Sequence, residues 1–159
     1  MRQISDICPV CGMRTEINIP SVTHNKMYFH FCSEQCRKTF SDHPTIYSSK
    51  AGKAQNEILK RRTMRLTTPL DREVSALLIP YLKEMMGVKM VTVEDDTINI
   101  SYDLLQVTES QIEKALGEIG LQLGGSWLEQ LRRAWVHDSE EIELDNLAAP
   151  RYHRTRPQA

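Results

Sequence analysis

Four cysteines near the N-terminus are the residues of this chain whose type and spacing most clearly indicate chemistry. Cys8 and Cys11 are separated by two residues, Cys32 and Cys36 by three, and twenty residues lie between the two pairs. Thiolates are soft metal ligands, and two close pairs brought together make a closed tetrahedral site, with metal–sulfur distances of about 2.3 Å for zinc. The spacing predicts one metal site formed by all four cysteines, with Zn²⁺ as the expected occupant.

Two other interpretations of the four cysteines stay open. Four thiolates also hold iron–sulfur clusters, and in an oxidising compartment the two pairs form disulfides. The chain has no apolar run near the roughly 18 residues of a membrane span, and it does not begin with a cationic segment followed by an apolar one. We therefore expect a cytoplasmic protein without membrane insertion, and in a reducing compartment a metal explains the paired cysteines better than disulfides do.

The sequence around each pair is suited to present its thiolates. Gly12 permits a tight turn after Cys8 and Cys11, and the stretch 17–31 is expected to form a hairpin that brings the second pair close. If Ser33 begins a helix, Cys32 and Cys36 lie on one face of its first turn, where the helix dipole favours the thiolate. A unit of about 45 residues with few aliphatic side chains also needs a structural metal to fold.

Residues 6–47 resemble the YHS and TRASH group of treble-clef modules. The resemblance is carried by Cys8-Pro-Val-Cys11-Gly12-Met13, by the stretch from Met27 to Phe40 and by Asp42-His43-Pro44-Thr45-Ile46-Tyr47. It implies a treble-clef fold that handles or senses copper or a similar soft ion, so that Cu⁺ is a second expected occupant. Many YHS modules have one cysteine before the Gly-Met pair, whereas Cys8 supplies a second here, as in the TRASH pattern.

Three further side chains near the cysteines are candidates for an accessory soft-metal site. They are Met13, His24 and His30, because thioether and imidazole groups both suit copper. The competing interpretation is that Met13 fills the core and that His30, which alternates with Phe29 and Phe31, is a strand residue facing solvent.

A second periodic region follows from about residue 63. Its pattern predicts a strand at 64–67, a helix from the cap Asp71 to Gly87, strands at 88–93 and 98–102, a helix from Thr108 to Gly120 and a short strand at 121–123. This βαββαβ order indicates a ferredoxin-like sandwich. Ser126 is expected to begin a further helix, whose apolar stripe Trp127, Leu128, Leu131, Ala134 and Trp135 is expected to cover the sheet or a neighbouring domain.

We therefore expect an α+β chain with four parts. These are a treble-clef metal-binding domain at 1–48, a basic linker at 49–62, a ferredoxin-like domain with its C-terminal helix at 63–137, and an acidic segment with a flexible tail at 138–159.

The stretch from Thr63 to Leu123 resembles the heavy-metal-associated domain of copper chaperones and copper ATPases. The resemblance is clearest at 86–93 and 112–121 and is mostly a hydrophobic pattern. That family binds metal through two cysteines before its first helix, and the matching positions here are Asp71 and Val74. The resemblance therefore implies no metal in this domain, and suggests docking onto a heavy-metal transporter or chaperone domain, or a homodimer formed through a sheet edge.

The charge distribution adds one alternative function. From Lys50 to Leu66 six basic residues stand against one acidic residue, a net charge of +5, whereas the chain from Thr67 onward carries −7. This basic segment is expected to be a solvated linker, but Lys60, Arg61 and Arg62 are also candidates for contact with nucleic acid or a partner in a metal-responsive regulator.

No phosphate-binding loop, nucleophile elbow or metalloprotease helix is present in the sequence, so we do not expect an enzyme. The expected function is metal binding in copper or similar soft-metal homeostasis, as a carrier, scavenger or adaptor. The alternatives are the regulator and an interaction module whose zinc is purely structural.

Overall fold

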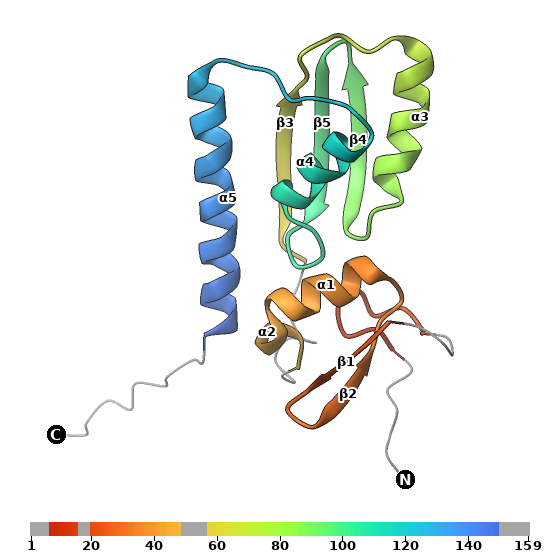
Figure 1. Ribbon diagram of the computed structural model, residues 1–159, viewed down its shortest axis with the longest axis vertical. Helices are drawn as coiled ribbons and strands as arrows, with labels where there is room; N and C mark the ends of the chain where they lie inside the picture. The colour runs from red at the N-terminus through yellow and green to blue at the C-terminus, as the bar shows by residue number, and fades with distance from the viewer. Residues whose placement is uncertain (1–6, 16–19, 49–56, 150–159) are drawn as a thin grey trace, which may run out of the picture.

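The computed structural model describes residues 7–15, 20–48 and 57–149 and has an α+β architecture. A small hairpin and two short helices form one end, and a three-stranded sheet with its helices forms the other (Figure 1). The elements in chain order are β1 (Ser21–His24), β2 (Met27–His30), α1 (Glu34–Asp42), α2 (Pro44–Ser48), β3 (Leu59–Arg65), α3 (Arg72–Lys83), β4 (Val88–Glu94), β5 (Thr97–Asp103), α4 (Glu109–Glu118) and α5 (Trp127–Ala148).

The hairpin and helix expected around the second cysteine pair are both present. β1 and β2 pair antiparallel, and the turn residues Asn25 and Lys26 have φ values of +50° and +64°. Ser33 caps α1, because its hydroxyl oxygen accepts the backbone N–H of Cys36 at 3.2 Å. These local signals confirm the prediction that Ser33 begins a helix next to the second pair.

The three-stranded sheet has the order β3-β5-β4, with both pairs antiparallel. Asp71 and Thr108 cap α3 and α4 as expected, and the two helices help to cover one face of the sheet. The core on that face contains Met64, Leu66, Leu78, Leu82, Val91, Ile98, Ile100, Tyr102, Val107, Ile112 and Leu116. α3 ends at Lys83, four residues before the predicted end at Gly87, which instead adopts φ +93° in the turn into β4.

The predicted fourth strand is not formed as a strand. Residues 121–123 contribute a single bridge, Leu66 to Leu123, at the end of β3. Gly120 turns the chain with φ +84°, and Gly124 follows after only three intervening residues, with its N–H bonded to the Arg65 carbonyl. Too few residues lie between the two glycines to pair along the whole of β3.

The predicted basic linker at 49–62 is wrong over its last four residues. Residues 49–56 lie outside the described ranges, but Leu59–Arg62 form the first half of β3 and pair with β5. The side chains of Lys60 and Arg62 face the helices, where acidic residues neutralise them. The sequence looks like a solvated basic run because those partners lie about 80 positions further along the chain.

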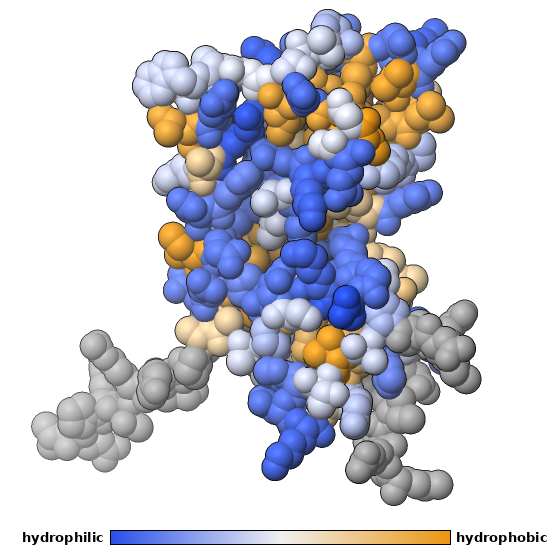
Figure 2. Space-filling model, viewed as in Figure 1, coloured by the Kyte–Doolittle hydropathy of each residue, from blue (hydrophilic) through white to orange (hydrophobic). Residues whose placement is uncertain are grey.

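The acidic segment predicted to begin at residue 138 is helical up to Ala148, as part of α5. Its Glu140 and Leu144 are buried, and they form the face by which α5 packs on the rest of the molecule. The apolar stripe expected to cover the sheet or a neighbouring domain does not cover the sheet: Trp127, Leu128, Leu131, Ala134 and Trp135 are all exposed. Hydrophobic atoms are visible along the outer edge of α5 (Figure 2).

A second core joins the N-terminal unit, which comprises residues 7–15 and 20–48, to the sheet and to α5. It contains Cys8, Phe31, Cys36, Phe40, Ile46, Tyr47, Leu104, Leu105 and Leu144. Polar contacts reinforce it: the Gln35 amide donates to the Met86 carbonyl at 2.8 Å and accepts from the Met86 N–H at 2.9 Å. The N-terminal unit is therefore packed against the loops at one end of the sheet. Within the described ranges, no helix is both long and apolar enough to cross a membrane.

Candidate metal centre

The first cysteine pair lies in a tight turn. An isolated bridge joins Ile7 to Arg14, the Cys8 N–H donates to the Met13 carbonyl at 2.8 Å, and the Gly12 N–H donates to the Cys8 carbonyl at 2.9 Å. Gly12 has φ +75°, a conformation that costs glycine little. The turn holds both sulfurs on one side, as the sequence predicted.

The second pair is set by the junction between β2 and α1. Cys32 follows the strand, and Cys36 lies in the first turn of the helix, where its N–H is bonded to Ser33. The free N–H groups and the dipole of a helix N-terminus stabilise a thiolate at this place. Two segments about twenty residues apart therefore direct their thiols to one point.

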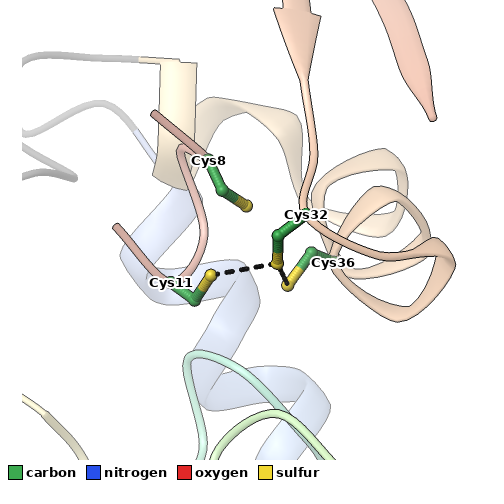
Figure 3. A group of neighbouring side chains, drawn as sticks. All are labelled: Cys8, Cys11, Cys32 and Cys36. Atoms are coloured by element: carbon green, nitrogen blue, oxygen red, sulfur yellow. Dashed lines mark hydrogen bonds between the residues drawn. The ribbon is translucent and has the colours of Figure 1, made fainter. Parts of the chain in front are cut away.

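All four sulfur atoms converge, within 4.8 Å of one another (Figure 3). The Cys11 and Cys32 sulfurs are 3.3 Å apart, and those of Cys32 and Cys36 are 3.6 Å apart. In a tetrahedral zinc site with metal–sulfur bonds of about 2.3 Å, neighbouring sulfurs are separated by about 3.8 Å. All four cysteines are free thiols. The donor set and its spacing therefore fit a single metal ion bound by four thiolates.

The four thiols differ in exposure, and their neighbours shift the pKa values of the two buried ones, Cys8 and Cys36, in opposite directions. Cys8 and Cys36 are 1% and 0% exposed, whereas Cys11 and Cys32 are partly exposed. Hydrogen bonds from Cys11 and Cys36 hold the pKa of Cys8 far below its ordinary value. Interactions with Cys11 and Cys8 raise the pKa of Cys36 far above its ordinary value. Without a metal, repulsion between neighbouring thiolates opposes ionisation of all the sulfurs at once, and the positive charge of a bound cation offsets that repulsion.

The three candidates for an accessory site lie around the cluster without joining it. Met13 is 52% exposed, just after the turn that holds the first pair. His24 ends β1, with its ring edge-on to Phe40 at 6.0 Å, and His30 ends β2 opposite Ser21. Neither histidine is among the groups of ligand atoms that converge within 4.8 Å in the described part of the chain.

Lys60, Arg61 and Arg62, the candidates for nucleic-acid or partner contact, alternate between the two faces of β3. Arg61 is exposed, but Lys60 forms an ion pair with Glu143 at 2.6 Å, and Arg62 one with Glu109 at 3.2 Å. Arg62 also pairs with Glu140 at 3.3 Å. Two of the three basic side chains are thus already neutralised within the chain.

A second group of possible ligands was not predicted from the sequence. The largely buried ring of His43 lies between two carboxylates of α5, with Nε2 3.1 Å from Glu141 and 3.4 Å from Asp145. The two contacts between the His43 ring and these carboxylates account for the arrangement without a metal. The two carboxylates are one helical turn apart, so the periodicity of α5 is the signal that could have found them, but their histidine is about 100 residues away.

Comparisons with known proteins give one distant likeness. No family model matches the chain, and no curated protein matches it. Among solved structures the chain is similar to one titled "CsoZ metallochaperone", with 20% sequence identity and a TM-score of 0.40, over 43% of this chain and all of that one.

Proposed function

We propose that this chain binds one soft metal ion through Cys8, Cys11, Cys32 and Cys36 and acts in soft-metal handling, as a carrier, scavenger or adaptor, rather than as an enzyme. The observation that carries the proposal is the convergence of four free thiols within 4.8 Å. A single ion brings thiolates this close, whereas an iron–sulfur cluster inserts its own iron and sulfide between them. The spacing therefore supports Zn²⁺ or Cu⁺ over a cluster.

The uneven exposure of the four sulfurs supports exchange of the ion. Cys11 and Cys32 are partly exposed, so an incoming thiolate from a partner has access to the ion on their side. Cys8 and Cys36 would stay bound in the core while such a ligand replaces the other two. Thiolate sites of this kind bind Cu⁺ as well as Zn²⁺, since both ions accept soft ligands.

A second candidate function is an interaction module with a structural zinc. The observation in its favour is that Cys8 and Cys36 share a core with Leu104, Leu105 and Leu144, so the ion would stabilise the junction between the two units.

Metal exchange separates the two functions. The zinc-loaded chain is mixed with a chromophoric zinc chelator, and with Cu⁺ under anaerobic reducing conditions, and the release of zinc is compared with the rate of global unfolding. Release much faster than unfolding, and faster still after Cys11→Ser than in the wild-type chain, supports metal handling. Release that occurs only as fast as the chain unfolds supports the structural zinc.

A further inference from the structure

A groove runs between β3 and α5, where the fourth strand of a ferredoxin-like sheet would lie. It has a volume of about 490 Å³, and five consecutive strand residues, Arg61 to Arg65, form one wall. Arg132, Arg133 and Trp135 of α5 contribute to the opposite wall. Since residues 121–123 supply only one bridge at the end of β3, most of this strand edge is left unpaired by the described part of the chain.

The hydrogen bonds at the end of β3 show which backbone groups face this β3–α5 groove. The Arg65 carbonyl accepts from the Gly124 N–H at 2.8 Å, on the side away from β5, and the Thr67 N–H donates to the Gln122 carbonyl at 2.9 Å on the same side. In an antiparallel strand the N–H and C=O of one residue point the same way, and alternate residues point alike. The backbone groups of Thr63 and Arg61 therefore point into the groove.

The groove also has unbalanced positive charge. Five arginines line it, against Glu109 and Glu129. Three of the five are already paired: Arg62 with Glu109 and Glu140, Arg65 with Asp96, and Arg133 with Glu113. Among the described residues no ion pair involves Arg61 or Arg132, and these two arginines supply the free positive charge of the groove. A free strand edge beside unpaired arginines favours an extended chain with carboxylate side chains over a neutral one.

We propose that the β3–α5 groove binds an extended acidic segment of a partner protein, which adds to the sheet as its fourth strand. The backbone of the segment bonds to Arg61 and Thr63, its carboxylates pair with Arg61, and the positive charge of Arg132 on α5 attracts them at longer range. Adjacent paired residues in a sheet direct their side chains to the same face. Residues of the segment beside Arg61 and Arg65 therefore face solvent and should be acidic.

Residues of the segment beside Met64 face α5, where Trp135 lines the groove. These should be apolar, so the expected ligand alternates acidic and apolar residues. β3 rises about 3.3 Å per residue, and a peptide of about seven residues is long enough to cover the open edge.

The test measures binding of a capped peptide of alternating glutamate and valine to the metal-loaded full chain, by anisotropy of a labelled peptide. Thr63→Pro removes the N–H that faces the groove but no ladder bond to β5, so it should weaken binding about tenfold or more. Thr63→Val is the matched control, because it keeps the N–H while losing the hydroxyl bond to Asn99, and should bind within about twofold of the wild-type chain. Arg61→Ala with Arg132→Ala should weaken binding and reduce its dependence on salt.

Three results would overturn the proposal. The first is no binding of the alternating peptide at millimolar concentration. The second is that the Thr63→Pro and Thr63→Val variants bind the peptide equally well. If Thr63→Pro does not fold, the corresponding result is that the wild-type chain binds the peptide and its backbone N-methylated form equally well. The third is tighter binding of a single-stranded oligothymidine than of the peptide, which would assign the arginines to nucleic acid. The peptide assay is independent of the metal-exchange result.

Discussion

The buried pairing of Arg62 gives the sharpest quantitative prediction. Arg62 is 26% exposed, and its partners Glu109 and Glu140 are 4% and 2% exposed. Glu140 also accepts the Tyr102 hydroxyl at 2.6 Å and the Glu109 N–H at 2.9 Å, so it keeps donors if the arginine is lost. Glu109 would then be a buried carboxylate without a cation.

Replacing Arg62 by alanine should lower the free energy of unfolding by about 3–5 kcal/mol, the usual cost of removing one partner of a buried ion pair. With a denaturant dependence of about 1–3 kcal/mol per molar urea, the unfolding midpoint should fall by at least about 1 M. The assay is urea unfolding of the zinc-loaded chain, followed by circular dichroism. Arg61→Ala is the matched control, because that side chain is exposed, and it should change stability by less than about 0.5 kcal/mol.

A second substitution tests whether charge is the cause. In the Arg62→Ala background, Glu109→Gln should recover part of the lost stability, since it removes the uncompensated charge. Equal stability of Arg62→Ala and Arg61→Ala would refute the reasoning, and would restore Arg62 as a solvated residue available for a partner.

Three further predictions concern titration, backbone conformation and metal removal. Burial raises the pKa of Glu109 above its ordinary value of about 4.5, so folding penalises the charged form of this carboxyl, and the stability it contributes is lost as pH rises through the folded pKa. In urea unfolding, the stability difference between Glu109→Gln and the wild-type chain should therefore shift in favour of the variant between about pH 4.5 and 7. A difference that stays constant over this range would contradict the prediction. Gly87 has φ +93°, and a Cβ there would lie 2.6 Å from the Cβ of Gln106. Gly87→Ala should therefore lower the free energy of unfolding by about 1–2 kcal/mol for the backbone conformation and by about 1–3 kcal/mol for the steric overlap. Thermal unfolding measures the effect, and an unchanged midpoint would contradict it. Leu104 and Leu105 pack in the same core as Cys8 and Cys36, so removing the metal with a chelator should speed hydrogen exchange at their backbone amides. Equal exchange rates with and without metal would show that the metal does not stabilise this core.

The sequence predicted the features that depend on neighbouring residues. Ser33, Asp71 and Thr108 each begin a helix, because a cap acts on N–H groups two or three positions away. The spacing of the cysteines likewise predicted the convergence of the four thiols, since a turn and a helix start position each pair locally.

The features that the sequence did not predict depend on distant partners. The charges of Lys60 and Arg62 looked solvated because Glu143 and Glu140 lie far along the chain. Glu140 itself lies in an acidic run, and only its contacts with β3, β5 and α4 make it a buried residue. The short stretch 121–123 has the composition of a strand, but its length is limited by the glycines on either side.

The central claim is that one metal ion binds to the four cysteines, and elemental analysis of the purified chain tests it most directly. The chain is prepared under reducing conditions, equilibrated with zinc, and freed of excess metal by gel filtration before metal and protein are quantified. Close to one zinc per chain is expected, falling to near zero in a Cys32→Ser, Cys36→Ser variant and staying near one in His43→Ala, which alters the other group of possible ligands. An absence of zinc from the reduced wild-type chain, or retention of zinc by the double cysteine variant, would contradict the claim.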